Sequence, residues 1–246
     1  SKDISFQTNI SFTTADNLVK EIANGDKYIW GAGYGIPYNN LVRFQEGESP
    51  GIFWGYLADG IFQNQSEIDN HATQPNAQPG DIRFVDVNGD GVVNADDRTK
   101  IGDPFGDFSL GWNLNLNVYN FDLSVTTYGL FGNDIFRGYE RNLNYTNKPV
   151  SVLARWTGEG TSNFEPRATF VDSNNNVRPS TRYVEDGSYF KIKNVQLGYN
   201  FNVTNSKVLD AVRLYIQGKN LMTFTDYTGY DPEMSYGVLD TGIDRG

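Results

Sequence analysis

The sequence has no cysteine, one histidine and an excess of acidic over basic residues. Without cysteine, the chain can form neither a disulfide framework nor a thiolate metal site. Lys and Arg number 20 against 30 Asp and Glu, and the net charge is −10. Because phosphate contacts need a basic surface, this balance argues against a nucleic-acid-binding protein.

Long apolar runs are also missing. No stretch of about 18 apolar residues occurs, which excludes a transmembrane helix, although the strands of a membrane β-barrel produce no such run. Apolar residues make up 38% of the 246 residues, aromatic residues 14%, and there are 26 glycines. This composition favours β-structure with many turns over a helical bundle, and the length fits one domain.

Residues 108–128 carry the clearest structural pattern. Apolar side chains occupy every even position from Phe108 to Val118, and Ser, Gly or Asn occupies each odd position between them. After a tight connection at Tyr119 and Asn120, the apolar row resumes at Phe121. The alternation predicts two strands with one apolar and one uncharged polar face. Strands of about 10 residues with short turns are typical of membrane barrels, although a soluble β-sandwich uses the same alternation.

Similar patterns predict further elements along the chain. The first residues already alternate, so the chain opens inside a strand and we expect it to be part of a longer protein. A long polar span, about 133–181, indicates functional loops. The predicted elements are a strand in 1–14, two strands in 41–63 around a Pro50-Gly51 turn, a short helix at 66–72 capped by Ser66, a strand in 182–201 with a bulge at Asn194-Val195, and a strand from Val212 to Phe224.

An acidic loop is the sharpest local motif. Oxygen-bearing side chains stand at loop positions 1, 3, 5 and 9, Gly91 at position 6 and a carboxylate at position 12, which is the spacing that wraps a chain around Ca²⁺. Position 12 is Asp and not Glu, which shortens the usual bidentate reach. The alternative is a series of Asx-turns that satisfy one another. The predicted ligands of a structural Ca²⁺ are Asp86, Asn88, Asp90, Val92 through its carbonyl, Asn94 and Asp97.

No motif supports catalysis, and we expect the chain not to be an enzyme. The one histidine, His71, lies in a polar stretch without a serine elbow or a cysteine partner. Acid pairs at Glu185-Asp186 and at Asp231 and Glu233 could imitate glycosidase carboxylates but carry little information. Aromatic residues of the turns and loops could form a membrane girdle, pack in a core or stack on a sugar: Trp30, Tyr34, Tyr38, Trp54, Tyr139, Tyr145 and Trp156.

Several segments, in order along nearly the whole chain, carry a family resemblance. They are residues 55–63 (GYLADGIFQ), 79–91 (PGDIRFVDVNGDG), 97–104 (DRTKIGDP), 132–135 (GNDI), 182–190 (RYVEDGSYF), 197–199 (LGY) and 220–233 (NLMTFTDYTGYDPE). Together they resemble the C-terminal barrel portion of the SusC/RagA family, the TonB-linked outer-membrane importers of Bacteroidetes.

The resemblance implies an all-β fold in which antiparallel strands form part of a large transmembrane β-barrel with long extracellular loops. In the family the barrel has roughly 22 strands and is closed by a plug. Residues 1–246 would supply its C-terminal part, and we expect the plug domain, the TonB box and the final strand to lie outside this chain.

The implied function is nutrient import across the outer membrane of a Gram-negative, Bacteroidetes-like cell. Oligosaccharides or peptides, captured with a SusD-like surface lipoprotein, would pass through the barrel, and the missing N-terminal part would contact the TonB complex. Membrane lipid would cover the apolar strand face, and the polar face suits neutral polar cargo. The alternatives are a soluble, secreted calcium-binding β-sandwich module that binds carbohydrate and, less favoured, a secreted hydrolase fragment.

Overall fold

The structure is a computed structural model that describes residues 3–31, 40–138, 148–203, 209 and 211–233. The chain divides into two compact units, and each is described by itself. The first comprises residues 1–16, 105–133 and 186–233, and the second comprises residues 17–104, 134–185 and 234–246.

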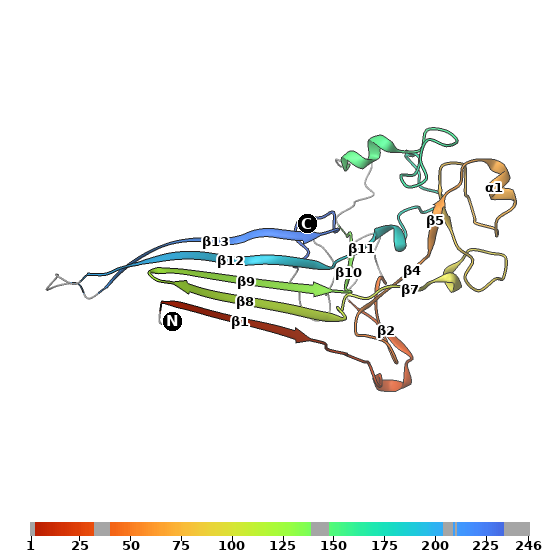
Figure 1. Cartoon of the computed structure of the whole chain (residues 1–246). Helices are drawn as coiled ribbons and strands as arrows, with labels where there is room; N and C mark the ends of the chain where they lie inside the picture. Colours follow the sequence, from red (N-terminus) through yellow and green to blue (C-terminus); the bar gives the residue numbers. More distant parts are fainter. Residues whose placement is uncertain (1–2, 32–39, 139–147, 204–208, 210, 234–246) are drawn as a thin grey trace. The chain divides into compact units, whose positions relative to one another are not determined.

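The first unit is a single sheet of five long strands. They are β1 (Ile4–Thr13), β8 (Phe108–Val118), β9 (Phe121–Phe131), β12 (Tyr189–Phe201) and β13 (Val212–Thr225), in the order β1-β8-β9-β12-β13 (Figure 1). Every neighbouring pair is antiparallel. The strands predicted in 1–14, in 108–128 and from Val212 to Phe224 are therefore confirmed. The strand predicted in 182–201 begins only at Tyr189, and Val184–Asp186 forms a separate short strand that pairs with Asp134–Phe136.

The pairing register keeps one apolar face across the whole sheet. Leu116 lies opposite Phe6 on β1 and opposite Leu123 on β9. One residue along, Asn115 lies opposite Gln7 and Ser124, which places polar side chains together on the other face. The β8–β9 turn that sets this register has Tyr119 at a φ of 52°. Because side chains alternate with a period of two, a slip of one residue would exchange the two faces.

The predicted bulge in β12 is present, and it begins just before Asn194. Ile192 lies opposite Thr127 of β9, but Asn194 lies opposite Thr126, so Lys193 is the extra residue on this side. The insertion returns Asn194 to the polar face, where it faces Lys219 of β13. This explains the break in the apolar pattern of the sequence.

The second unit consists of short strands joined by long connections. A four-stranded sheet has the order β2-β3-β4-β7, and two pairs of strands, β5-β6 and β10-β11, accompany it. The predicted turn at Pro50-Gly51 is confirmed between β3 and β4, with Gly51 at a φ of 79°. The strands are β2 (Tyr28–Trp30), β3 (Val42–Gln45), β4 (Ile52–Gly55), β5 (Ala58–Ile61), β6 (Ile82–Phe84), β7 (Thr99–Gly102), β10 (Asp134–Phe136) and β11 (Val184–Asp186).

Helix α1 differs from the prediction. It spans Gln65–Asp69 and not residues 66–72, and its cap is Asn64 and not Ser66. The Asn64 side chain accepts a hydrogen bond from the Glu67 N–H (3.0 Å), and the Glu67 carboxylate accepts one from the Gln63 N–H (2.9 Å). These two bonds fix the start of the helix one residue earlier. Short 3₁₀ turns occupy Ala23–Gly25, Ala95–Asp97, Val150–Ala154 and Thr181–Tyr183. No helix of the described ranges is long and apolar enough to cross a membrane.

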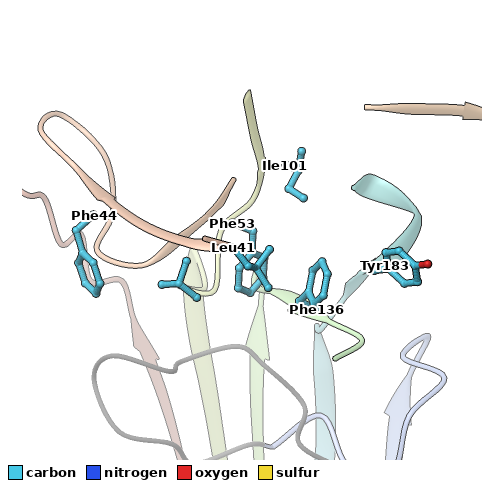
Figure 2. Close-up of a cluster of buried hydrophobic side chains, with 7 residues drawn as sticks. Leu41, Phe44, Phe53, Ile101, Phe136 and Tyr183 are labelled. Atoms are coloured by element: carbon cyan, nitrogen blue, oxygen red, sulfur yellow. The ribbon is translucent and has the colours of Figure 1, made fainter. Parts of the chain in front are cut away.

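The second unit has its own apolar core (Figure 2). Phe53 and Phe136 are fully buried, and their rings meet edge to face with centroids 5.9 Å apart. A smaller cluster is formed by Ile82 and Phe84 of β6 and by Val93 of the loop that follows it. The main cluster comprises Leu41, Val42, Phe44, Phe53, Ile101, Phe136 and Tyr183.

Buried polar side chains form hydrogen bonds with backbone groups of β6 that have no neighbouring strand. The backbone N–H of Phe84 donates to Gln74 Oε1 (2.9 Å), and the N–H of Ile82 donates to Asn176 Oδ1 (2.7 Å). The Ile82 carbonyl accepts from both Gln74 (2.8 Å) and Asn174 (3.1 Å). Because buried backbone groups must be paired, these amides replace a neighbouring strand along one edge of β6.

Candidate functional site

The acidic loop connects β6 and β7, and it folds on its own side chains. The Asp86 carboxylate accepts hydrogen bonds from the N–H groups of Gly89 (2.7 Å) and Gly91 (2.8 Å). Asn88 Oδ1 accepts from the Asp90 N–H (2.9 Å), and Asp90 Oδ1 accepts from the Val92 N–H (2.8 Å). These are Asx-turns, the conformation that the alternative interpretation of the motif predicts.

Asp97 closes the loop from inside. Its side chain is fully buried and accepts from the N–H groups of Val87 (2.8 Å), Asn88 (3.3 Å) and Asn94 (2.7 Å). Burial alone would raise the pKa of Asp97, but the hydrogen bonds from the backbone of Asn94, Asn88 and Val87 outweigh it and hold that pKa below its ordinary value. Asn94 in turn caps the 3₁₀ turn Ala95–Asp97.

The predicted ligands differ in exposure: Asn88, Asp90 and Val92 are exposed, Asp86 and Asn94 are half-buried, and Asp97 is buried. Both carboxylate oxygens of Asp86 and of Asp97 accept hydrogen bonds from backbone N–H groups. The side-chain and carbonyl oxygens of the exposed residues are of the kind that suits a hard cation. In the described part of the chain, no three His, Cys, Asp or Glu side chains are grouped as a metal site requires. Calcium binding therefore stays a prediction.

The polar face of the five-stranded sheet is a second candidate site. Rows of amide and hydroxyl side chains cross it from strand to strand, and neighbours bond one another: Gln217 Nε2 donates to Asn194 Oδ1 (2.6 Å), and Asn117 Nδ2 donates to Ser5 Oγ (2.9 Å). Such a surface can exchange hydrogen bonds with hydrated polar solutes without binding them tightly. One complete row is Gln7, Asn115, Ser124, Gln196 and Gln217.

The opposite face of the same sheet exposes large apolar side chains. Phe6 is 64% exposed, Ile10 67% and Ile216 73%. They come from strands at both edges of the sheet, and Leu116, Leu123 and Leu197 connect them across it. Soluble monomers rarely expose apolar patches that extend this far, so this face is built to meet lipid or another protein.

A groove of about 340 Å³ opens in the second unit. Two of the arginines that line it are held by acids: Arg167 Nε lies 2.8 Å from Asp81 Oδ1, and Arg182 lies 2.7 Å from Glu165 Oε2. Sequence reasoning missed this groove because its residues belong to the polar span without periodicity. Its charged lining consists of Lys148, Arg155, Glu165, Arg167, Asp172 and Arg182.

The residues considered for catalysis have structural partners. His71 Nδ1 lies 2.8 Å from the Ala72 carbonyl, and its ring meets Phe62 edge to face. Glu185 pairs with Arg137 at 2.9 Å. Asp231 lies 2.6 Å and Glu233 3.1 Å from the buried Lys191 Nζ.

The aromatic side chains of the second unit are divided between packing and polar contacts. Trp156 Nε1 donates to Gln63 Oε1 (3.2 Å), and its ring packs over Gly80. Trp30 and Trp54 lie in the β2-β3-β4-β7 sheet beside Arg43. Tyr34, Tyr38, Tyr139 and Tyr145 lie outside the described residues.

Known proteins similar to this chain are TonB-dependent receptors and a peptide transporter. No family model matches the chain. TonB-dependent receptor P3 of Formosa agariphila is 32% identical over 96% of this chain and 24% of its own length. TonB-dependent receptor SusC of Bacteroides thetaiotaomicron is 26% identical over 96% of this chain and 23% of its own. The solved structure of the RagAB peptide transporter superposes on 99% of this chain and 26% of its own with a TM-score of 0.74 at 18% identity.

A sheet of long antiparallel strands with one apolar and one polar face, and these relatives, define a strand segment of a TonB-dependent receptor barrel. Within that class the chain belongs to the SusC/RagA family, as the resemblance predicted. It spans about a quarter of the length of the curated relatives it matches.

Proposed function

We propose that this chain forms C-terminal barrel strands of an outer-membrane, TonB-dependent importer of oligosaccharides or peptides. The observation that carries the proposal is the two-faced sheet of the first unit. Its strands of 10 to 14 residues are long enough to cross the hydrocarbon layer at a tilt. The exposed apolar face suits lipid, and the polar face, which is rich in amides and also carries the Asp122–Arg213 ion pair, suits a water-filled lumen through which polar cargo passes.

The proposed partners follow from the relatives. A SusD-like surface lipoprotein would capture cargo with the importer, and the TonB complex would act on the part of the protein that precedes these strands. The similarity to SusC and to the RagAB peptide transporter supports this assignment without choosing between glycan and peptide cargo. The long connections of the second unit suit contact with such a lid-like partner.

The acidic loop has a structural role in this proposal. Ca²⁺ bound by Asp86, Asn88, Asp90, the Val92 carbonyl and Asn94 would stiffen a loop that the carboxylate of Asp97 already closes. We do not assign it a switching role, because the Asx-turns hold the same loop by themselves.

The competing proposal is a soluble carbohydrate-binding module with a β-sandwich fold, which differs in what would cover the apolar face. In a sandwich, a second sheet covers that face. In the described residues of the first unit, Phe6, Ile10 and Ile216 are instead exposed. The lipid-facing interpretation therefore accounts for the sheet better.

A pull-down tests the proposal. The tagged full-length parent is extracted from outer membranes with detergent, and its partners are identified by mass spectrometry. We expect a stoichiometric surface lipoprotein and loss of growth on the cognate glycan or peptide when the gene is deleted. Recovery of the native parent from a salt-only extract, without detergent or a partner, would contradict the importer and favour the soluble module.

A further inference from the structure

The outer face of the β2-β3-β4 sheet holds an arginine between two aromatic rings. The guanidinium carbon of Arg43 lies 3.6 Å from the ring centroid of Tyr28 and 3.8 Å from that of Trp54. Tyr28 and Trp54 come from the strands on either side of β3, so the stack is fixed by the sheet. Stacking covers the flat faces of a guanidinium but leaves its N–H groups directed outward in the plane.

Two buried polar atoms on this face have no hydrogen-bond partner. Arg43 Nε is a donor and Gln45 Oε1 an acceptor, and neither is paired within the described residues. Arg43 and Gln45 stand two apart on β3, so their side chains share one face. Leaving such atoms unpaired is costly, and a ligand that offers both an acceptor and a donor would remove the cost.

The same two residues help to line a hollow of about 300 Å³, together with Lys27, Tyr28 and Glu46. The acid of this set is already engaged, because Glu46 Oε1 accepts a hydrogen bond from the Ile22 N–H (2.9 Å). No carboxylate pairs with Arg43 in the part of the chain that the structure describes. The lining therefore holds two cations, Lys27 and Arg43, against the one carboxylate of Glu46, in a protein whose net charge is −10.

A second arginine strengthens the positive potential. Arg98 lies over the Trp30 ring at 5.0 Å and donates to the Trp54 carbonyl (2.9 Å). Burial lowers the pKa of Arg43 from its ordinary value, and the charge of Arg98 lowers it further against the opposing effect of Tyr28. A guanidinium keeps its proton at neutral pH in spite of such effects, so both cations remain charged.

We propose that this hollow binds a ligand carrying a carboxylate next to a hydroxyl or amide N–H group. The carboxylate accepts from the in-plane N–H groups of Arg43, and the neighbouring donor bonds Gln45 Oε1. Uronic acids and the C-terminal end of a peptide both carry this pair of groups. The site is a property of these residues and holds whether or not the parent imports the ligand.

Calorimetry on the detergent-solubilised full-length parent tests the site. The probes are glucuronate with glucose as its neutral control, and glycylglycine with its C-terminal amide as control, at matched ionic strength. We expect millimolar or tighter binding of at least one carboxylate probe and none of its neutral control. Glucuronate alone would identify a sugar-acid site, and glycylglycine alone a peptide site.

Arg43→Lys supplies the decisive variant, because it keeps the charge but removes the planar fork. We expect it to weaken binding of the carboxylate probe about tenfold, with the unfolding temperature unchanged. Arg83→Lys is the matched control, since Arg83 pairs with Asp59 away from the hollow (3.0 Å). Absence of binding by either carboxylate probe, or equal binding by Arg43→Lys, would overturn the proposal. The growth and pull-down experiments test the import function only, so their failure would not contradict a carboxylate-binding site at Arg43.

Discussion

Asp122 on β9 and Arg213 on β13 form an ion pair across an intervening strand. Arg213 Nε donates to Asp122 Oδ1 at 3.0 Å, and a second bond joins Nη2 to Oδ2. The residue between them on β12 is Gly198, which lies directly opposite Asp122. A Cβ on Gly198 would stand 2.5 Å from Asp122 Oδ1, so the pair depends on the missing side chain.

The Gly198→Ala variant tests this dependence. We expect it to displace the Asp122–Arg213 pair and to lower the unfolding temperature, because the added methyl group would occupy the space of the Asp122 carboxylate and the Arg213 guanidinium. Thermal unfolding of the full-length parent in detergent measures the effect. Ser124→Ala, on the same face of β9, is the control and should change stability little. Equal stability of the two variants would contradict the stated role of Gly198.

Arginine substitutions distinguish the two faces of the sheet. Leu114 and Asn115 are neighbours on β8 but point to opposite faces. If lipid covers the apolar face, Leu114→Arg costs about 2–4 kcal/mol near the midplane of the bilayer. Asn115→Arg, directed to the polar face, should cost far less. Denaturant titration in lipid vesicles measures the stability of both variants. A larger loss of stability for Asn115→Arg than for Leu114→Arg would contradict the assignment of the faces.

The acidic loop should respond to removal of a surface carboxylate. We expect Asp90→Ala to weaken Ca²⁺ binding by the full-length parent while the barrel stays folded, because Asp90 contributes only to the loop. Calorimetry with Ca²⁺ measures the affinity. Asp69→Ala, on the exposed end of α1, serves as a control that removes the same charge elsewhere. If the wild type fails to bind Ca²⁺ at millimolar concentration, the loop is held by its Asx-turns alone.

Asp97 gives the same loop a pH dependence. Its pKa is lower in the folded protein than in the unfolded chain, so its contribution to stability is fully present above the unfolded pKa of about 3.9. That contribution is lost as the pH falls through the lower, folded value. Hydrogen exchange at the Val87 and Asn94 amides, corrected for the intrinsic rate, should accelerate in this window. Asp97→Asn should open the loop already at neutral pH, and unchanged protection would refute the assigned closure.

Asp81 ties together three segments of the second unit. Its fully buried carboxylate accepts from Arg167 Nε (2.8 Å), Asn176 Nδ2 (3.1 Å) and the Gln78 N–H (2.9 Å). Asp81→Ala should cost about 3–5 kcal/mol, because it leaves a partly buried arginine without its partner. Limited proteolysis between residues 148 and 185 reports the loosening. Asp59→Ala, which breaks the exposed pair with Arg83, should leave the proteolysis pattern unchanged.

The sheet of the first unit could be predicted because its cause is local. Apolar and polar side chains alternate along each strand, and the pattern recorded even the bulge beside Lys193. Alternation also limits the register, since only even offsets keep Leu116, Leu123 and Leu197 on one face, and between β8 and β9 the short turn at Tyr119 and Asn120 selects one of them. The family resemblance then named the architecture that such strands build.

The interior of the second unit could not be predicted, for the opposite reason. Gln74, Asn174 and Asn176 look like ordinary loop residues, yet all three are buried because they bond the backbone of β6. Gln74 and Asn174, which bond each other, are 100 residues apart in the sequence. Short-range patterns carry no record of such pairings. The stack around Arg43 was not predicted either, although Trp30 and Trp54 beside it were among the aromatic residues noted in the sequence.

The outer strands of the first unit carry a practical consequence. In the strand order of the sheet, β1 and β13 stand at the two ends, and each has one neighbouring strand among the described residues. A strand in that position presents a row of backbone donors and acceptors that is a template for another copy. Produced apart from its parent, this segment should therefore polymerise edge to edge into insoluble material, and its refolding would require the preceding strands to be supplied on the same polypeptide or in trans.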